Sequence, residues 1–199
     1  MLGAVVAFNH GTACQNLAAI RDLGQAERWY RRSLDLRAKG DRMGRAKCLG
    51  QLGSDAYERF REARNTKPAP ELMRHLNDAL GRYRDALDMT PPDAVGQLAP
   101  IHNELGNIYG GAGDLDRAPH HCRESIRLNE ARGDPYGAAT TRRNLAITRP
   151  ERFPNLRRQR HRGGPKDRRT DRPHRQSRRA PNPGPPALTS VYKVCIIKM

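Results

Sequence analysis

The chain has 199 residues, of which 36% are apolar, 5% aromatic and 29% charged, and its formal net charge is +16. This composition suffices for one small domain with a thin apolar core. No run approaches the roughly 18 apolar residues of a membrane span, and the apolar residues 1–8 lack the basic start and the length of a signal peptide, so we expect a cytoplasmic protein without a membrane segment.

Small and aromatic residues at helical spacing predict a first helix pair near the N-terminus. Ala13-Cys14-x-x-Leu17 leads to a second element, Ala26-x-x-x-Tyr30-x-x-Ser33. Its counterpart further along the chain opens with Leu52-Gly53 and closes with Ala79-x-x-x-Tyr83-x-x-Ala86-x-x-x-x-Pro91. Each unit has the spacing of a helix, a turn and a second helix packed against the first.

The clearest unit comes third. It reads Leu105-Gly106-x-x-Tyr109-x-x-x-Gly113-x-x-x-x-Ala118, and Leu145-Ala146 opens a fourth within a predicted helix over 136–148. Gly40-Asp41 and Gly133-Asp134 follow predicted second helices, where the glycine can leave the helix in a left-handed conformation and the aspartate can cap the next helix. The second unit is longer than the third, so we expect an insertion near 60–74, as longer helices or as a rim loop.

This order of residues resembles the tetratricopeptide repeat, in the long form found in actinobacterial and other bacterial regulatory proteins. The resemblance covers residues 8–148. In that family the Gly and Ala positions let two helices approach closely, while Leu and Tyr fill the seam. The resemblance implies an all-α fold, an antiparallel helix-pair solenoid of seven helices with right-handed superhelical twist and no strands.

The resemblance also implies a function. First helices of such arrays line a concave groove that holds an extended peptide or a partner helix. We therefore expect a non-catalytic protein-interaction module, a fragment of a larger regulatory protein. The groove residues carried over from the family are Lys47, Ser54, Tyr57, Asn103, Asn107, Thr140 and Arg143, with a weakly specific wall of Phe8, Gln15 and Ala18. Asn103 and Asn107 are the best candidates to bond a peptide backbone, and two solvated asparagines are the alternative.

No residue pattern indicates an enzyme, a metal or a cofactor. Adjacent side chains in His120-His121-Cys122 point about 100° apart on a helix, so they cannot share one ion. Gly110-Gly111-Ala112-Gly113 lacks the strand and the Lys-Ser/Thr of a phosphate loop and is expected to be an inter-helix turn. The four cysteines are expected to be small buried hydrophobes rather than disulfides.

Residues 149–199 differ in composition from the rest of the chain. Positions 150–199 hold 14 Lys and Arg against 3 Asp and Glu, and they show no helical or strand period. We expect a disordered tail. Two readings of it stay open: a reading-frame shift inside the fourth unit, or a basic tail that binds nucleic acid through Arg157, Arg158, Arg160 and Arg162.

Overall fold

Seven α-helices and one short 3-10 helix make up the part of the chain, residues 2–147, that this computed structural model describes. The helices are α1 (Leu2–Asn16), α2 (Leu23–Asp35), α3 (Arg42–Ala63), α4 (Ala69–Met89), α5 (Val95–Gly111), α6 (Arg117–Ala131) and α7 (Pro135–Ile147), and η1 (Ala18–Ile20) joins α1 to α2. The described residues contain no strand, which confirms the all-α prediction. The predictions for residues 149–199 concern residues outside this range.

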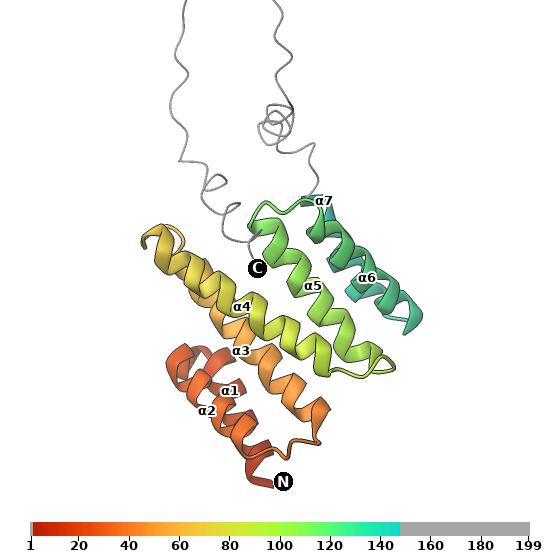
Figure 1. Cartoon of the computed structure of the whole chain (residues 1–199). Helices are drawn as coiled ribbons and strands as arrows, with labels where there is room; N and C mark the ends of the chain where they lie inside the picture. The colour runs from red at the N-terminus through yellow and green to blue at the C-terminus, as the bar shows by residue number, and fades with distance from the viewer. Residues whose placement is uncertain (1, 148–199) are drawn as a thin grey trace, which may run out of the picture.

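Consecutive helices lie side by side and run in opposite directions (Figure 1). The closest packing is within the pairs α1–α2, α3–α4 and α5–α6, and α7 packs on α6. The protein is thus a helical-repeat protein. None of the helices in the range 2–147 is both long and apolar enough to cross a membrane.

In each pair, a glycine on the first helix packs against a larger side chain on the second helix. A Cβ added to Gly53 would lie 2.9 Å from the Tyr83 ring, and one added to Gly106 would lie 2.6 Å from Cys122 Sγ. Four residues before these partners stand Ala79 and Ala118, both with no exposed surface. Close approach at small residues is therefore what brings the helices of the second and third pairs together.

The first pair follows the same rule with a different glycine. Cys14 was expected to be a small buried residue, but it is half-buried, and it is Gly11 whose added Cβ would lie 2.7 Å from the Tyr30 ring. Gly11 and Tyr30 are 19 residues apart, whereas Gly106 and Cys122 are 16 apart, and the link that contains η1 lies between Gly11 and Tyr30. Ala26 and Tyr30 are fully buried, as their spacing predicted.

The turns between the helix pairs agree in part with the predicted glycine exits and aspartate caps. Gly133 has φ +71°, in the left-handed region, and Asp134 accepts a hydrogen bond from the Gly137 amide at 2.8 Å at the start of α7. Asp41 caps α3 by accepting from the Gly44 amide at 2.9 Å. Gly40 is not among the described glycines with positive φ, so the left-handed exit predicted there is wrong.

The second pair is the longest. α3 has 22 residues and α4 has 21, and only residues 64–68 separate them. The extra residues near 60–74 therefore extend both helices instead of forming a large rim loop. As a result, α3 and α4 project beyond their neighbours (Figure 1).

Removal of the α2 cap is expected to destabilise the fold by about 1 kcal/mol. The Asp22 carboxylate accepts from the Gly24 amide at 2.8 Å and from the Gln25 amide at 2.9 Å, so Asp22→Ala leaves two amides without their partner. Asp35→Ala, an exposed acid at the other end of the same helix, is the matched control and should leave the urea midpoint unchanged or slightly raised. Equal midpoints for the two variants would contradict the capping role.

Candidate functional site

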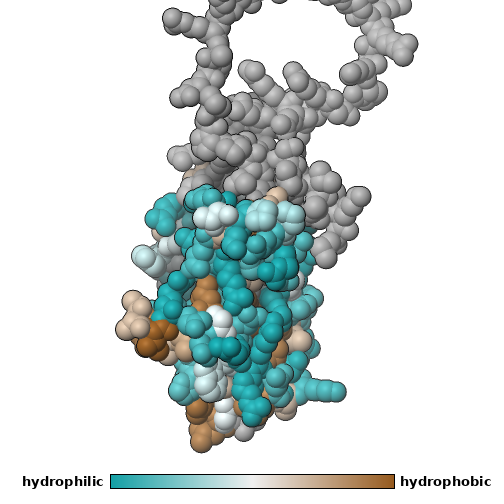
Figure 2. Space-filling view, turned by 90° about the vertical axis from the view of Figure 1, so that its left-hand side faces the viewer, coloured by the Kyte–Doolittle hydropathy of each residue, from teal (hydrophilic) through white to brown (hydrophobic). Residues whose placement is uncertain are grey.

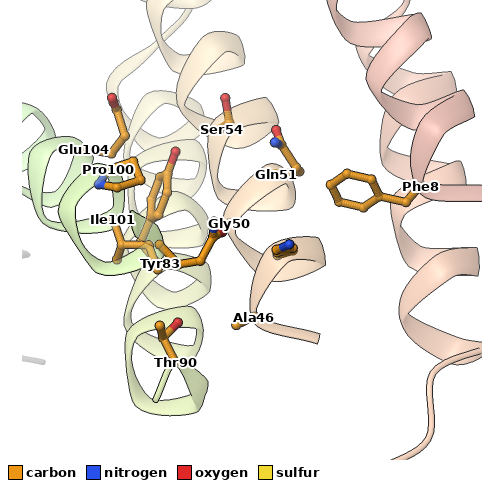
Figure 3. Close-up of a pocket in the computed structure, with 12 residues that line it drawn as sticks. Phe8, Ala46, Gly50, Gln51, Ser54, Tyr83, Thr90, Pro100, Ile101 and Glu104 are labelled. Atoms are coloured by element: carbon orange, nitrogen blue, oxygen red, sulfur yellow. The ribbon is translucent and has the colours of Figure 1, made fainter. Parts of the chain in front are cut away.

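The principal candidate site is a groove of about 300 Å³ on the side of the molecule where first helices of the three pairs face one another. It lies mainly between α3 and α5, with Phe8 of α1 facing Gln51 across the opening (Figure 3). Its lining residues are Phe8, Ala46, Lys47, Gly50, Gln51, Ser54, Tyr83, Thr90, Gln97, Pro100, Ile101 and Glu104. They combine apolar surface with amides, hydroxyls and one charge of each sign.

Short side chains on α3 keep the groove open. Ala46, Gly50 and Ser54 recur every four residues and so share one face of the helix. A Cβ added to Gly50 would meet no atom within 4 Å, so the space above it is empty. The Ser54 hydroxyl accepts a hydrogen bond from Gln15 Nε2 at 3.1 Å, which ties α1 to this face.

The α5 wall carries a proline within the helix. Pro100 has no amide hydrogen, so the Gly96 carbonyl lacks the donor that a helix normally supplies four residues on. Pro100 itself lines the groove, one turn from Gln97 and from Glu104. The wall thus presents the polar side chains of Gln97 and Glu104 beside the apolar surface of Ile101.

Glu104 is the acid of the groove, and two amides hold it. Asn103 Nδ2 donates to Glu104 Oε1 at 3.0 Å, and Asn107 Nδ2 donates to Oε2 at 3.4 Å. Burial raises the pKa of Glu104, while the hydrogen bonds from Asn107 and Asn103 lower it. Asn103 also accepts a hydrogen bond from Asn144 of α7 at 3.0 Å.

Two of the predicted groove residues, Lys47 and Ser54, line this groove. The other five lie outside its lining. Tyr57 stacks on Phe60 with ring centroids 5.8 Å apart, Asn103 and Asn107 bond Glu104, Thr140 is half-buried and Arg143 is exposed on α7. Contact of any of the seven with a ligand stays a prediction.

Several lining residues were not predicted as groove residues. Gln51 on α3, and Gln97, Pro100 and Ile101 on α5, belong to runs with the 3–4 residue spacing of one helix face. The sequence therefore held a signal for them.

The histidines of α5 and α6 form a contact but no metal centre. His102 Nδ1 and His121 Nδ1 lie 3.0 Å apart, and His121 stacks on Tyr109. Burial lowers the pKa of His121 to about 4 and also lowers that of His102. Cys122 points into the α5–α6 seam, and no group of three metal-binding side chains occurs within residues 2–147.

A second, smaller cavity of about 100 Å³ lies between α2, α3 and α4. It is lined by Glu27, Arg31, Leu52, Asp55, Ala56, Arg59, Arg74, His75, Asp78 and Arg82. Asp55 is only 2% exposed, and neither of its carboxyl oxygens has a hydrogen-bond partner among the described residues. Burial raises the pKa of Asp55 to about 7, against a smaller lowering by Arg59.

Comparison with known proteins adds little to this geometry. No family model matches the chain, and no curated protein matches it either. Among solved structures, BtubC (BKLC) from P. vanneervenii is 15% identical over 89% of this chain and 98% of its own, with a TM-score of 0.26. A TM-score this low supports no inference about this chain.

Proposed function

We propose that this chain is a tetratricopeptide-like solenoid that binds a segment of a partner protein in the groove between α3 and α5, without catalysis. The observation that carries the proposal is an open groove of about 300 Å³ to which first helices of all three pairs contribute. Its lining combines apolar side chains with amides and hydroxyls, which suits a peptide that presents both side chains and backbone hydrogen-bonding groups.

The repeated seams favour the tetratricopeptide assignment. Glycine on each first helix meets Tyr30, Tyr83 or Cys122 on the second, and the residues four places earlier, Ala26, Ala79 and Ala118, are buried. Such units bury their apolar faces by stacking, which is the physical basis of helical repeat arrays. A cytoplasmic regulatory protein of which this chain is a fragment fits the proposal.

Blocking the groove tests the proposal. Gly50→Trp puts a large side chain into the groove, whereas Gly81→Trp, on the exposed side of α4, puts the same side chain into solvent; an added Cβ meets no atom within 4 Å at either site. Both changes should preserve or slightly raise the melting temperature, because tryptophan has a higher helix propensity than glycine. The two variants therefore differ in whether the added tryptophan fills the groove.

We expect 12-residue peptides selected from a random display library on the full chain to lose at least about ten-fold in affinity on Gly50→Trp and to keep it on Gly81→Trp. Affinities measured by fluorescence anisotropy would decide the matter. Peptides that bind all three chains equally would show that the groove is not the binding site.

The nucleic-acid alternative rests on the charge of the tail. Positions 150–199 carry a formal charge of +11 out of the +16 of the whole chain. Binding through arginines to phosphates should weaken steeply as salt is added, while groove binding should change modestly. A salt titration with single-stranded DNA and with a selected peptide separates the two functions.

A further inference from the structure

The groove has opposite charges at its two ends. Figure 3 places Ala46 and Thr90 at one end and Ser54 and Glu104 at the other. Lys47 follows Ala46 on α3, seven residues before Ser54, which corresponds to about 10 Å of helix. The groove is thus basic at the Lys47 end and acidic at the Glu104 end.

Both charges are available to a ligand. Lys47 is exposed, and neither Lys47 nor Glu104 takes part in an ion pair among residues 2–147. Asn103 and Asn107 fix the Glu104 carboxylate by two hydrogen bonds but do not neutralise it. A cationic donor of the ligand would satisfy its remaining acceptor sites, and such charge-assisted hydrogen bonds are strong where the acceptor is held and partly buried.

The groove between the two charges contains apolar side chains as well as the amide of Gln51. Phe8 approaches from α1, Ile101 from α5 and the ring of Tyr83 from α4 (Figure 3). A helix about 10–12 Å across would not enter a groove of about 300 Å³, whereas an extended segment can. A polyproline II segment has three residues per turn and rises about 3.1 Å per residue, so residues i and i+3 share one face about 9 Å apart.

We propose that the groove selects an extended peptide segment with an acidic side chain at the Lys47 end, a Lys or Arg three residues away at the Glu104 end, and an apolar side chain between them. This inference rests on the proposed function, and it adds the chemistry of the partner. The acid of the ligand pairs with the Lys47 ammonium. Its ammonium or guanidinium donates to Glu104, and the intervening apolar group packs on Ile101 and the ring of Tyr83.

The test uses the full chain and a random 12-residue display library, with Lys47→Gln and Glu104→Gln as parallel baits. Peptides selected on the unsubstituted chain should pair an acidic and a basic residue three positions apart. Peptides selected on Glu104→Gln should keep the preference for an acidic residue and lose the preference for a basic residue. Peptides selected on Lys47→Gln should keep the preference for a basic residue and lose the preference for an acidic residue. Lys39→Gln and Glu71→Gln, which change charge outside the groove, are the controls and should keep both preferences.

A synthetic peptide from the first selection completes a double-mutant cycle. Replacing its basic residue by glutamine should weaken binding about five-fold on the unsubstituted chain and less than about two-fold on Glu104→Gln. Circular dichroism of each bait checks that it is folded. Because the tail is basic, it could also attract acidic peptides, but a preference due to the tail would survive in Lys47→Gln.

The outcomes separate the two proposals. If selected peptides lose affinity on Gly50→Trp but keep the same charge preferences on both glutamine baits, the charge inference is overturned while groove binding stands. If no peptide prefers the unsubstituted chain to Gly50→Trp, groove binding fails and the inference fails with it.

Discussion

Replacing Gly106 with leucine is expected to lower the free energy of unfolding by about 3 kcal/mol, because it overpacks the seam between α5 and α6. A Cβ at this position would already lie 2.6 Å from Cys122 Sγ and 3.3 Å from the Cys122 backbone nitrogen. The backbone of α6 would have to move away from α5, opening a seam in which Leu105, Ala118 and Cys122 have no exposed surface. Urea denaturation monitored by circular dichroism measures the change.

The control is Gly81→Leu on α4, where an added Cβ meets nothing within 4 Å and stability should rise by about 0.5–1 kcal/mol. A double-mutant cycle identifies the clashing atom. Gly106→Ala should cost less in a Cys122→Ala background, with a coupling energy of about 1 kcal/mol, because that background lacks the sulfur. Additive effects would mean that the Cβ added by Gly106→Ala does not clash with the Cys122 sulfur.

The seams could be predicted from the sequence because they depend on local spacing. Within each second helix the spacing is fixed, because Ala79 stands four residues before Tyr83 and Ala118 four residues before Cys122. The spacing between the two helices of the first pair also includes the link that contains η1, and it is Gly11 that packs on Tyr30.

The groove was only half predictable, because it has two different walls. Lys47 and Ser54 lie on the face of α3 that turns toward α5, and both line the groove. Asn103 and Asn107 on α5 were also carried over from the family, but neither of them lines the groove. Asn103 instead bonds Asn144 of α7. A sequence motif indicates which face of its own helix is buried. The lining of a groove also depends on how the neighbouring helix is rotated, which the motif does not specify.

Replacing Asp55 with asparagine is expected to stabilise the protein by about 2–4 kcal/mol at pH 8 and to have little effect near pH 4. Burial raises the pKa of Asp55 to about 7, from 3.8 for an unhindered aspartate. Between these pH values the unfolded chain has lost the proton that the folded chain retains, so folding becomes less favourable as the pH rises and the loss is complete above pH 7. Asparagine has nearly the same shape and cannot ionise. Part of the gain is offset if its amide also lacks hydrogen-bond partners.

Asp78→Asn is the matched control, because Asp78 lines the same cavity but is exposed, and its substitution should shift stability by less than about 0.5 kcal/mol at either pH. The free energies of unfolding of Asp55→Asn and of the unsubstituted protein must be compared at each pH, because His102 and His121 change stability with pH in the opposite direction to Asp55. Burial lowers the pKa of His121 to about 4 and lowers that of His102, so their contribution to stability is present above the unfolded pKa of about 6.5 and is lost as the pH falls toward 4. The two contributions oppose each other in the unsubstituted protein, whereas Asp55→Asn should keep the rise of stability with pH that the histidines produce. A gain from Asp55→Asn that is the same at pH 4 and pH 8 would show that the carboxyl group does not titrate in its cavity and that the effect has another cause.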